Sequence, residues 1–321
     1  MNRHVVFGTG QVGRHVVAHL VELGHDVVAA NRSGRGQFPG AQVIGGDVID
    51  PVFAKDVTRD ASTVYFCLNA TNYHRWPQEF PPLQDAVVAA ASANGARLVA
   101  LENLYAYGDT GGAPMTEATP TRPENEKGAT RAAMSQKLLD AHARGDLEVV
   151  IGRAADLVGP GVTASAMGEF VFGPVLAGKK AQTMGRPDTA HSYSYAPDVG
   201  RNLVLLGGRS EAYGRVWHLP NPETLTSRNV ITKVFEAIGA TPRITTLKRP
   251  MLRALGLTNR NVRELLHTYY QFEAPFIVDD SAFRAAIGGH TTGWDEIIDT
   301  TVAYYRTREP IASTSDLSTS D

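Results

Sequence analysis

Short apolar runs alternate with amphipathic stretches throughout the first half of the chain. Residues 4–7 predict a buried strand, and residues 11–23 predict a helix that ends at Gly24. Further strands are predicted at residues 26–30, 41–44, 63–68, 97–101 and 147–151, and further helices from residue 50 and at residues 83–93 and 125–143. Strands that alternate with helices indicate an α/β fold with a parallel sheet covered on both faces.

The pattern becomes less regular beyond residue 160. Helices are predicted at residues 162–177, 196–207, 227–238, 250–267 and 281–287, and one strand at residues 215–219. Residues 312–321 are rich in Ser, Thr and Asp with little apolar content, which predicts a disordered tail. We therefore predict a doubly wound domain over residues 1–160 and a smaller α/β lobe over residues 161–311, some of whose elements can return to the first sheet.

Composition narrows the classes of function. The 321 residues are 43% hydrophobic and carry a formal net charge of −2, which gives no indication of a nucleic-acid partner. We expect no signal peptide and no membrane span, because no apolar stretch is long enough for either. The one cysteine, Cys67, lies in an apolar run, so we expect a reducing cytoplasm. The histidines show no metal-ligand spacing, and we expect no metal site.

A glycine-rich turn joins the first predicted strand to the first predicted helix. It consists of Gly8, Thr9, Gly10, Gln11, Val12 and Gly13. In a G-x-G-x-x-G turn the first glycine permits the tight bend, the second lets backbone approach a pyrophosphate, and the third lets the helix pack on the strand. The helix N-terminus then offers N–H groups to the phosphates. The turn predicts a dinucleotide-binding domain of the Rossmann type.

The end of the second strand indicates which dinucleotide is bound. An acidic residue about 20 residues beyond the fingerprint would bind a ribose 2′-hydroxyl, and here the chain has Asn31, Arg32 and Ser33. Arg32 can pair with a 2′-phosphate, so NADP (NADPH) is favoured over NAD, unless Arg32 is only a solvated surface charge. After the third strand, Asp47 and Val48 either meet the adenine ring or serve as a helix cap.

With these segments in place, the chain resembles the extended or atypical short-chain dehydrogenases/reductases, the NAD-dependent epimerase/dehydratase group. The segment Leu68, Asn69 and Ala70 is similar to the stretch that passes under the cofactor riboses in that family. Residues 104–108 look like its "VYG" stretch, residues 152–161 like its "R…YGPG" stretch, and residues 193–199 like its "hVdDvA" stretch. The resemblance covers almost the whole chain and implies a Rossmann domain with a C-terminal substrate-binding lobe.

The resemblance fails at the catalytic residues. The family uses a Ser or Thr together with a Tyr-x-x-x-Lys pair, and the matching positions hold Asn103, Lys127 and Arg131. The sequence has no Tyr between Gly108 and Tyr193 that would restore the motif. The departure puts the family's activity in doubt for this chain.

Lys127 and Arg131 are four residues apart, so they share one face of the predicted helix. By analogy with the family, Arg131 would hold the nicotinamide ribose. Lys127 would donate a proton to a substrate oxygen or stabilise charge on it, with Asn103 giving a hydrogen bond. Tyr105 is an alternative proton donor. The competing interpretation is that the two cations lie on a solvated helix face.

Substrate contacts are predicted from Tyr107, His191 and Tyr193, because the resembled segments border the substrate cleft; sheet packing is the alternative for each. Trp76, Phe170 and Phe172 are candidates for an apolar pocket. A nucleotide-sugar substrate, which is common in the resembled family, is a further option. The smaller lobe has no clear diphosphate-binding cluster, although Lys179, Lys180 and Arg186 are available.

Two functions stay open. The first is an NADP-dependent oxidoreductase or epimerase/dehydratase-type enzyme on a small or medium organic carbonyl or sugar-like compound. The second is an NADP(H)-binding sensor without turnover, which the missing Tyr-x-x-x-Lys pair favours. The helices at residues 83–93 and 127–142 correspond to those that pair in dimers of the resembled family, so a homodimer is a further expectation.

Overall fold

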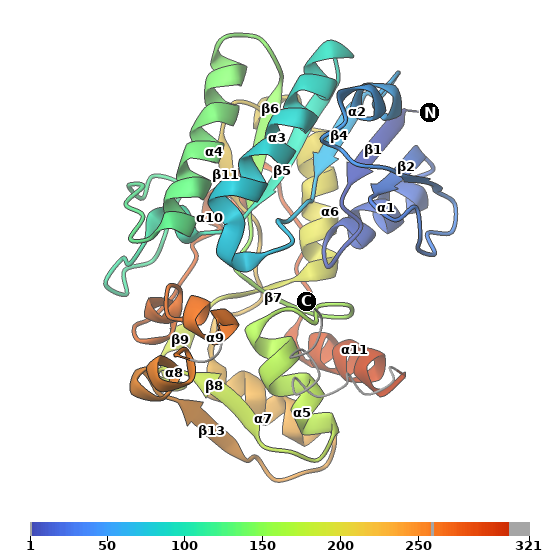
Figure 1. Ribbon diagram of the computed structural model, residues 1–321. Helices are drawn as coiled ribbons and strands as arrows, with labels where there is room; N and C mark the ends of the chain where they lie inside the picture. Colours follow the sequence, from blue (N-terminus) through green and yellow to red (C-terminus); the bar gives the residue numbers. More distant parts are fainter. Residues whose placement is uncertain (1, 258–259, 308–321) are drawn as a thin grey trace.

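The computed structural model of the protein describes residues 2–257 and 260–307, and its centre is a seven-stranded parallel sheet (Figure 1). The strand order is β3-β2-β1-β4-β5-β6-β11. The strands are β1 (Arg3–Phe7), β2 (Asp26–Asn31), β3 (Gln42–Gly45), β4 (Thr63–Phe66), β5 (Arg97–Glu102), β6 (Val149–Arg153) and β11 (Val216–His218). The central strands are buried on both faces, as their continuous apolar runs require.

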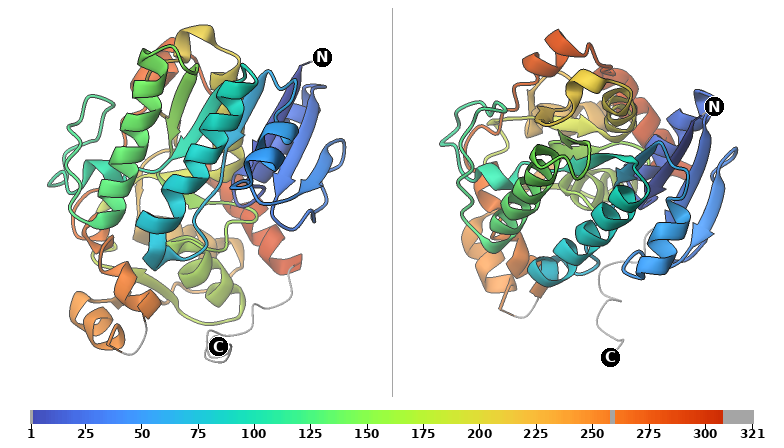
Figure 2. Two further views of the ribbon diagram at one scale, coloured as in Figure 1. Left: turned by 45° about the horizontal axis from the view of Figure 1, so that its top comes forward. Right: turned by 90° about the horizontal axis from the view of Figure 1, so that it is seen from above.

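Helices cover both faces of this sheet (Figure 2). One core packs α2 (Pro51–Val57), α3 (Trp76–Ala93) and α4 (Glu126–Ala143) against the first face. A second core packs α1 (Gly13–Glu22), α6 (Ala196–Gly207) and α10 (Ser281–Ala286) against the other face. The predicted doubly wound α/β fold is confirmed.

The second lobe is built from short strand pairs and helices, and it lies at the end of the sheet away from the N-terminus (Figure 1). Its strand pairs are β7 (Asp156–Val158) with β10 (Tyr193–Tyr195), β8 (Ala181–Met184) with β13 (Ile244–Leu247), and β9 (Ala190–His191) with β12 (Leu225–Thr226). Its helical elements are η3 (Gly168–Phe172), α5 (Gly173–Leu176), α7 (Ser227–Ala237), α8 (Arg249–Leu255), α9 (Arg260–Leu265), η5 (Tyr269–Phe272) and α11 (Trp294–Thr307).

The lobe is also where local predictions were wrong. The helix expected at residues 162–177 is replaced by one wide turn, η3, and the four-residue α5, because Gly168, Gly173 and Pro174 are poor helix formers. The helix expected at 250–267 is divided into α8 and α9. Helix α11 was not predicted, although Trp294, Ile297 and Ile298 begin a buried stripe at helical spacing.

Two elements from beyond residue 160, α6 and β11, lie with the first sheet. Strand β11 pairs in parallel with β6, and α6 packs beside α1 through residues of one core cluster. The domain boundary at residue 160 therefore stays a prediction, because α6 and β11 follow it in sequence but lie with the first sheet. The tail at residues 312–321 lies outside the described residues.

Candidate functional site

The glycine-rich turn after β1 has the geometry that its sequence pattern requires. Gly8 adopts a φ of +89°, and a Cβ placed there would lie 2.6 Å from the carbonyl oxygen of Cys67. A Cβ on Gly13 would lie 1.8 Å from the carbonyl oxygen of Gly8, whereas one on Gly10 would meet no described atom within 4 Å. Gly8 and Gly13 are thus needed by the turn itself, and the open face at Gly10 fits a phosphate group at the start of α1.

The polar residues of this turn hold it in place. Thr9 Oγ1 accepts a hydrogen bond of 3.1 Å from Asn31 Nδ2, and Gln11 Oε1 accepts one of 3.1 Å from the backbone N–H of Ala164. Val12 is buried in the core between α1 and the sheet. The turn is therefore connected both to the end of β2 and to the second lobe.

The end of β2 presents arginine rather than a carboxylate. The Asn31 amide is engaged within the loop, because its Nδ2 also donates to the carbonyl oxygen of Arg35 at 2.9 Å and its Oδ1 accepts from Ser33 Oγ at 3.0 Å. Arg32 is exposed, and its guanidinium donates to Thr71 Oγ1 at 3.4 Å. An exposed guanidinium beside the fingerprint suits an anionic group on the ribose.

The other predicted cofactor residues take varied positions. Asp47 is exposed and its Oδ1 accepts from the backbone N–H of Ile49 at 3.1 Å, while Asp50 is the residue that caps α2. Val48 is buried in the core that includes α2. In the segment after β4, Leu68 is half-buried, Asn69 is exposed and Ala70 is buried. Of these residues, Asp47 and Asn69 have exposed side chains.

Lys127 and Arg131 lie on one face of α4, and both are buried, with exposed fractions of 3% and 6%. Lys127 Nζ forms an ion pair with Glu264 of α9 and lies 3.2 Å from His267 Nδ1. The Arg131 guanidinium lies over the ring of Phe80, 4.0 Å from its centroid, and 5.1 Å from that of Trp76. The interpretation of a solvated helix face is wrong for both residues.

Asn103 and Tyr105 follow β5. Asn103 is half-buried, and its Oδ1 accepts from the backbone N–H of Tyr105 at 3.1 Å, which starts the turn η2 (Tyr105–Tyr107). The Tyr105 ring stacks on Trp76 with 6.0 Å between centroids. The amide oxygen of Asn103 thus stabilises the turn, and its amide nitrogen is the atom that can donate a hydrogen bond to a ligand.

A buried ionic cluster lies directly behind Asn103, and sequence reasoning missed it as a unit. Glu102 and Arg153 are 3% and 4% exposed, and their side chains approach to 3.8 Å between Glu102 Oε2 and Arg153 Nε. Ser135 of α4 donates to the Glu102 carboxylate and accepts from Arg153 at 3.1 Å. The cluster ties the carboxyl ends of β5 and β6 to α4, one helical turn beyond Arg131.

Tyr107 contributes to this interior rather than to an open cleft. Its hydroxyl lies 2.7 Å from Nε2 of His218, and the Arg153 guanidinium lies 4.6 Å from its ring centroid. Burial raises the pKa of Tyr107 and lowers the pKa of His218. Because its hydroxyl is engaged inside the protein, the substrate contact expected of Tyr107 is replaced by packing.

His191 and Tyr193 lie in the second lobe, on β9 and β10. His191 is 1% exposed, its Nε2 lies 2.9 Å from Asp156 Oδ2, and its ring stacks on Phe272 with 5.0 Å between centroids. The Tyr193 hydroxyl lies 2.7 Å from Ser227 Oγ. Tyr193 borders a small pocket, and His191 lies behind that pocket's wall.

The pocket is bounded by η3, β8, β10, α7 and η5. Its lining residues are Ala166, Met167, Phe170, Val171, Gln182, Thr183, Met184, Tyr193, Ser227, Ile231 and Phe272. Of the aromatic candidates, Phe170 lines it, whereas Phe172 is core and Trp76 packs with Tyr105.

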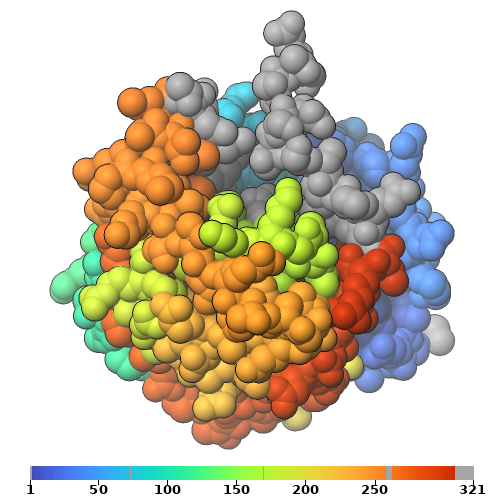
Figure 3. Space-filling model, turned by 90° about the horizontal axis from the view of Figure 1, so that it is seen from below, coloured from blue at the N-terminus to red at the C-terminus, as the bar shows by residue number. Residues whose placement is uncertain are grey.

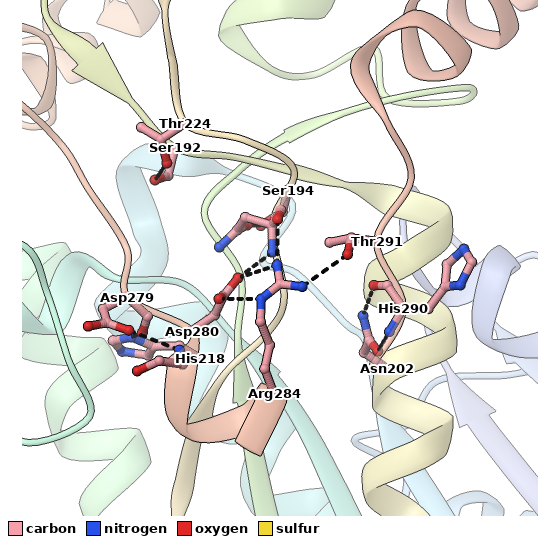
Figure 4. Close-up of polar contacts among 12 residues, drawn as sticks. Ser192, Ser194, Asn202, His218, Thr224, Asp279, Asp280, Arg284, His290 and Thr291 are labelled. Carbon is pink, nitrogen blue, oxygen red and sulfur yellow. Dashed lines mark hydrogen bonds and ion pairs between the residues drawn. The ribbon is translucent and has the colours of Figure 1, made fainter. Parts of the chain in front are cut away.

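Polar contacts hold the lobe against the sheet (Figure 4). Arg284 donates to Asp280 at 2.7 Å and to Thr291 at 3.0 Å, and the backbone N–H of His290 donates to Asn202 Oδ1 at 2.9 Å. The Arg284–Thr291 bond joins α10 to the segment before α11, and the His290–Asn202 bond joins that segment to α6.

Two classes of site are absent from residues 2–257 and 260–307. No helix there is long and apolar enough to cross a membrane. The His, Cys, Asp and Glu side chains of the same residues form no group of three or more that could hold a metal ion.

A parallel sheet with a glycine fingerprint after its first strand defines a dinucleotide-binding protein of the Rossmann type. The chain belongs to the NAD dependent epimerase/dehydratase family, whose model matches residues 5–219. This membership confirms the family that residues 8–13, 68–70, 104–108, 152–161 and 193–199 indicate.

Relatives of the chain include sugar-modifying enzymes. The chain is 28% identical over 163 residues to UDP-glucose 4-epimerase of Streptomyces lividans, a match that spans 45% of this chain and half (50%) of the epimerase. It is 25% identical over 260 residues to dTDP-6-deoxy-L-talose 4-dehydrogenase (NAD(P)(+)) of Kitasatospora kifunensis, covering 77% of this chain and 82% of that enzyme.

Solved structures share the fold. A dTDP-glucose 4,6-dehydratase from Streptomyces venezuelae with NAD bound has a TM-score of 0.77 at 17% identity, covering 95% of this chain and 97% of that chain. UDP-glucose 4-epimerase from Thermotoga maritima with UDP-glucose also has a TM-score of 0.77 at 17% identity, covering 95% and 99%. The family and its relatives support an enzyme of the oxidoreductase or epimerase type that uses a nicotinamide dinucleotide.

Proposed function

We propose that the protein is an NADP(H)-dependent oxidoreductase that acts on the carbonyl group of a small or medium organic compound. The observation that carries the proposal is the burial of Lys127 and Arg131, one turn apart on α4. By the resemblance to the family, these two residues take the places of the catalytic Tyr and Lys.

The preference for NADP rests on the end of β2. The family's acidic residue is replaced by Asn31, whose side chain is engaged with Thr9, Ser33 and Arg35. Arg32 is exposed beside it and can pair with a 2′-phosphate.

A bound nicotinamide would carry the hydride, and the residues of this chain would manage the proton. Lys127 donates it to the carbonyl oxygen, with the Asn103 amide nitrogen giving a second hydrogen bond. Glu264 compensates the charge of the ammonium group. His267, whose side chain is 44% exposed and which lies 3.2 Å from Lys127 Nζ, connects that group to solvent for reprotonation.

In the same proposal, Arg131 holds the nicotinamide ribose. Stacking on Phe80 restricts the plane of its guanidinium, so its donors are aimed before a ligand arrives. The buried Glu102–Arg153 pair positions Asn103 from behind and touches no reacting atom.

A second candidate is a sensor that binds NADP(H) without turnover. The ion pair between Lys127 and Glu264 favours it, because an ammonium group held by a buried carboxylate can be purely structural.

We also propose a homodimer formed through α3 and α4, in a reducing compartment such as the cytoplasm. The outer faces of these helices border a shallow groove that includes Ala89, Ala141 and Leu147 beside the charged pair Asp85 and Lys137. Small side chains allow close approach of a second pair of helices. Sedimentation of the purified protein would measure the assembly directly.

The test is titration of the protein with NADPH and NADH, followed by NADPH oxidation with a panel of aldehydes, ketones and sugar nucleotides. We expect tighter binding of NADPH and consumption with at least one carbonyl compound. Lys127→Ala should then remove turnover while NADPH still binds, and Lys137→Ala, an exposed lysine on the same helix, should not. Selective binding without turnover on any substrate would favour the sensor, and failure to bind either dinucleotide would reject both.

A further inference from the structure

The pocket in the second lobe indicates which kind of substrate the site takes. We propose that it receives an uncharged, apolar part of the substrate, so that the substrate is a neutral carbonyl compound and not a nucleoside diphosphate sugar. The position of the substrate's carbonyl group in this inference rests on the proposed function. The position of its apolar part rests on the pocket alone.

Two segments connect the pocket to the proposed reaction site. On one side, the segment that contributes Ala166 is bonded to the fingerprint turn two residues earlier, through Ala164 and Gln11. On the other side, the segment that contributes Phe272 carries Glu264 and His267, the partners of Lys127. Ala166 and Phe272 also share a hydrophobic cluster beneath α8. A ligand at Lys127 would therefore extend toward this pocket.

The wall of the pocket is chemically neutral. Among the residues that the structure describes, the lining consists of aliphatic, thioether and aromatic side chains together with a few hydroxyl and amide groups. Three of the four polar lining residues have partners in the protein: the Tyr193 hydroxyl lies beside Ser227 Oγ, and Thr183 Oγ1 donates to the carbonyl oxygen of Met184. The fourth, Gln182, is uncharged. A diphosphate requires several donors or cations, and this wall offers it none that is charged.

Two cations of the lobe are paired with carboxylates, and the exposed Lys179, Lys180 and Arg186 are not among the residues that line the pocket. Arg228 pairs with Asp188 at 2.5 Å, and Arg249 pairs with Glu273 at 2.5 Å. A carboxylate lies behind the wall, because His191, stacked on Phe272, is bonded to Asp156. That arrangement would oppose a polyanion and has no effect on an alkyl group.

The size of the pocket limits what enters it. It has room for about one water-sized group, so a longer chain requires its flexible walls to move. Met167 and Met184 supply that adaptability, since thioether side chains repack at low cost. Figure 3 shows this side of the molecule, where the orange α8–α9 segment lies beside the green η3–α5 segment.

The experiment is calorimetric titration of the full-length protein, in the presence of NADP+, with 2-butanone, 2-pentanone, 2-hexanone and 2-octanone, and separately with UDP-glucose and dTDP. NADP+ cannot reduce the ketones, so binding is read without turnover. We expect affinity to rise by about fourfold for each methylene until the pocket is filled. We expect UDP-glucose and dTDP to show no binding at the same concentrations.

A variant pair locates the effect. Ala166→Phe fills the pocket and should remove the dependence of affinity on chain length. Ala177→Phe, on the exposed surface after α5, should preserve that dependence. Affinity that is independent of chain length in the parent protein, or binding of UDP-glucose or dTDP, would overturn the inference whether or not Ala166→Phe folds. If the ketones bind as expected but NADPH is never consumed, the inference stands and the proposed oxidoreductase function fails.

Discussion

The two halves of the molecule differ in how their strands are built, and not in how far apart in sequence the paired strands lie. In the sheet, β1 pairs with β2 and β4 over four or five residues each, through strands with apolar centres. In the second lobe, β8 pairs with β13 so that Thr183 lies opposite Thr246, and β9 pairs with β12 through two residues each. Local apolar runs predict the strands of the sheet, whereas the short, partly polar strands of the lobe have no such pattern. The candidate site is assembled where the two meet.

Gly13→Ala tests the sheet half of the molecule at its glycine-rich turn. We expect this variant to have the largest effect on stability and on cofactor binding. The added Cβ would lie 1.8 Å from the backbone oxygen of Gly8, so the turn itself must move. We expect a loss of about 3 kcal/mol or more in the free energy of unfolding, together with loss of NADPH binding. Urea denaturation and a fluorescence titration measure the two.

Gly10→Ala is the matched control for that prediction. A Cβ at Gly10 would meet no described atom within 4 Å, so the melting temperature should stay close to that of the parent. NADPH binding should nevertheless weaken strongly, because the methyl group would stand where backbone approaches the pyrophosphate. If both variants fold normally and bind NADPH, the fingerprint turn is not the cofactor site.

Lys127→Met tests the contact between the halves. It leaves the Glu264 carboxylate, 8% exposed, without its ammonium partner. We expect a loss of about 3 kcal/mol in the free energy of unfolding, measured by urea denaturation. Lys137→Met, which breaks an exposed pair with Asp85, should cost less than about 1 kcal/mol.

The double variant Lys127→Met/Glu264→Leu separates pairing from packing. Replacing both charges by apolar groups should recover most of the stability lost in the single variant. Additive losses in the double variant would mean that Lys127 and Glu264 act independently, and that the lobe is held by other contacts.

The same contrast explains what could be predicted from the sequence. Repeated apolar runs and the turn at residues 8–13 predicted the sheet, and a spacing of four placed Lys127 and Arg131 on one helix face. Glu264 could not be predicted as the partner of Lys127, because 137 residues separate them and no motif connects them. The start of α3 at Trp76 was missed because Pro81 and Pro82 are typical of a break, yet both lie inside the helix, after Pro77 in its first turn. The pairing of Glu102 with Arg153 depends on two parallel strands ending together, which only the sheet order shows.

The pH dependence of stability also bears on the comparison of the two halves. Its main expected source is His4 of β1, in the half whose strands the sequence predicts. Burial lowers the pKa of His4 from 6.5 to about 4, and His25 adds to the shift. Since the unfolded chain binds a proton at higher pH than the folded chain, stability is full above pH 6.5 and falls as the pH drops toward 4. We expect a loss of about 2 kcal/mol between pH 7 and pH 5 from this residue. His15, whose pKa burial also lowers to about 4, should add its own loss.

His4→Phe should remove the His4 part of that loss while preserving the packing against Tyr65, whose ring centroid lies 6.0 Å from that of His4. Urea denaturation at pH 7 and pH 5 gives the two free energies. An unchanged difference between the two pH values in the variant would assign the acid sensitivity to other groups, such as His15.

Arg32→Gln should have the smallest effect of these variants. It tests a predicted cofactor contact made by a side chain that is not packed in either half of the fold. Arg32 is exposed after β2, and Thr71 Oγ1, at 3.4 Å, is the partner the structure gives its side chain. If the guanidinium meets a 2′-phosphate, the loss of a charge-assisted bond should weaken NADPH binding by about tenfold and leave NADH binding unchanged. Arg35→Gln, three residues along the same loop, is the control and should have a weaker effect. The difference between the two cofactors should shrink at high salt, because the contact is solvent-exposed. Equal weakening of NADPH and NADH would instead mean that Arg32 only shapes the loop through Thr71, and the preference for NADP would then have to arise from another residue.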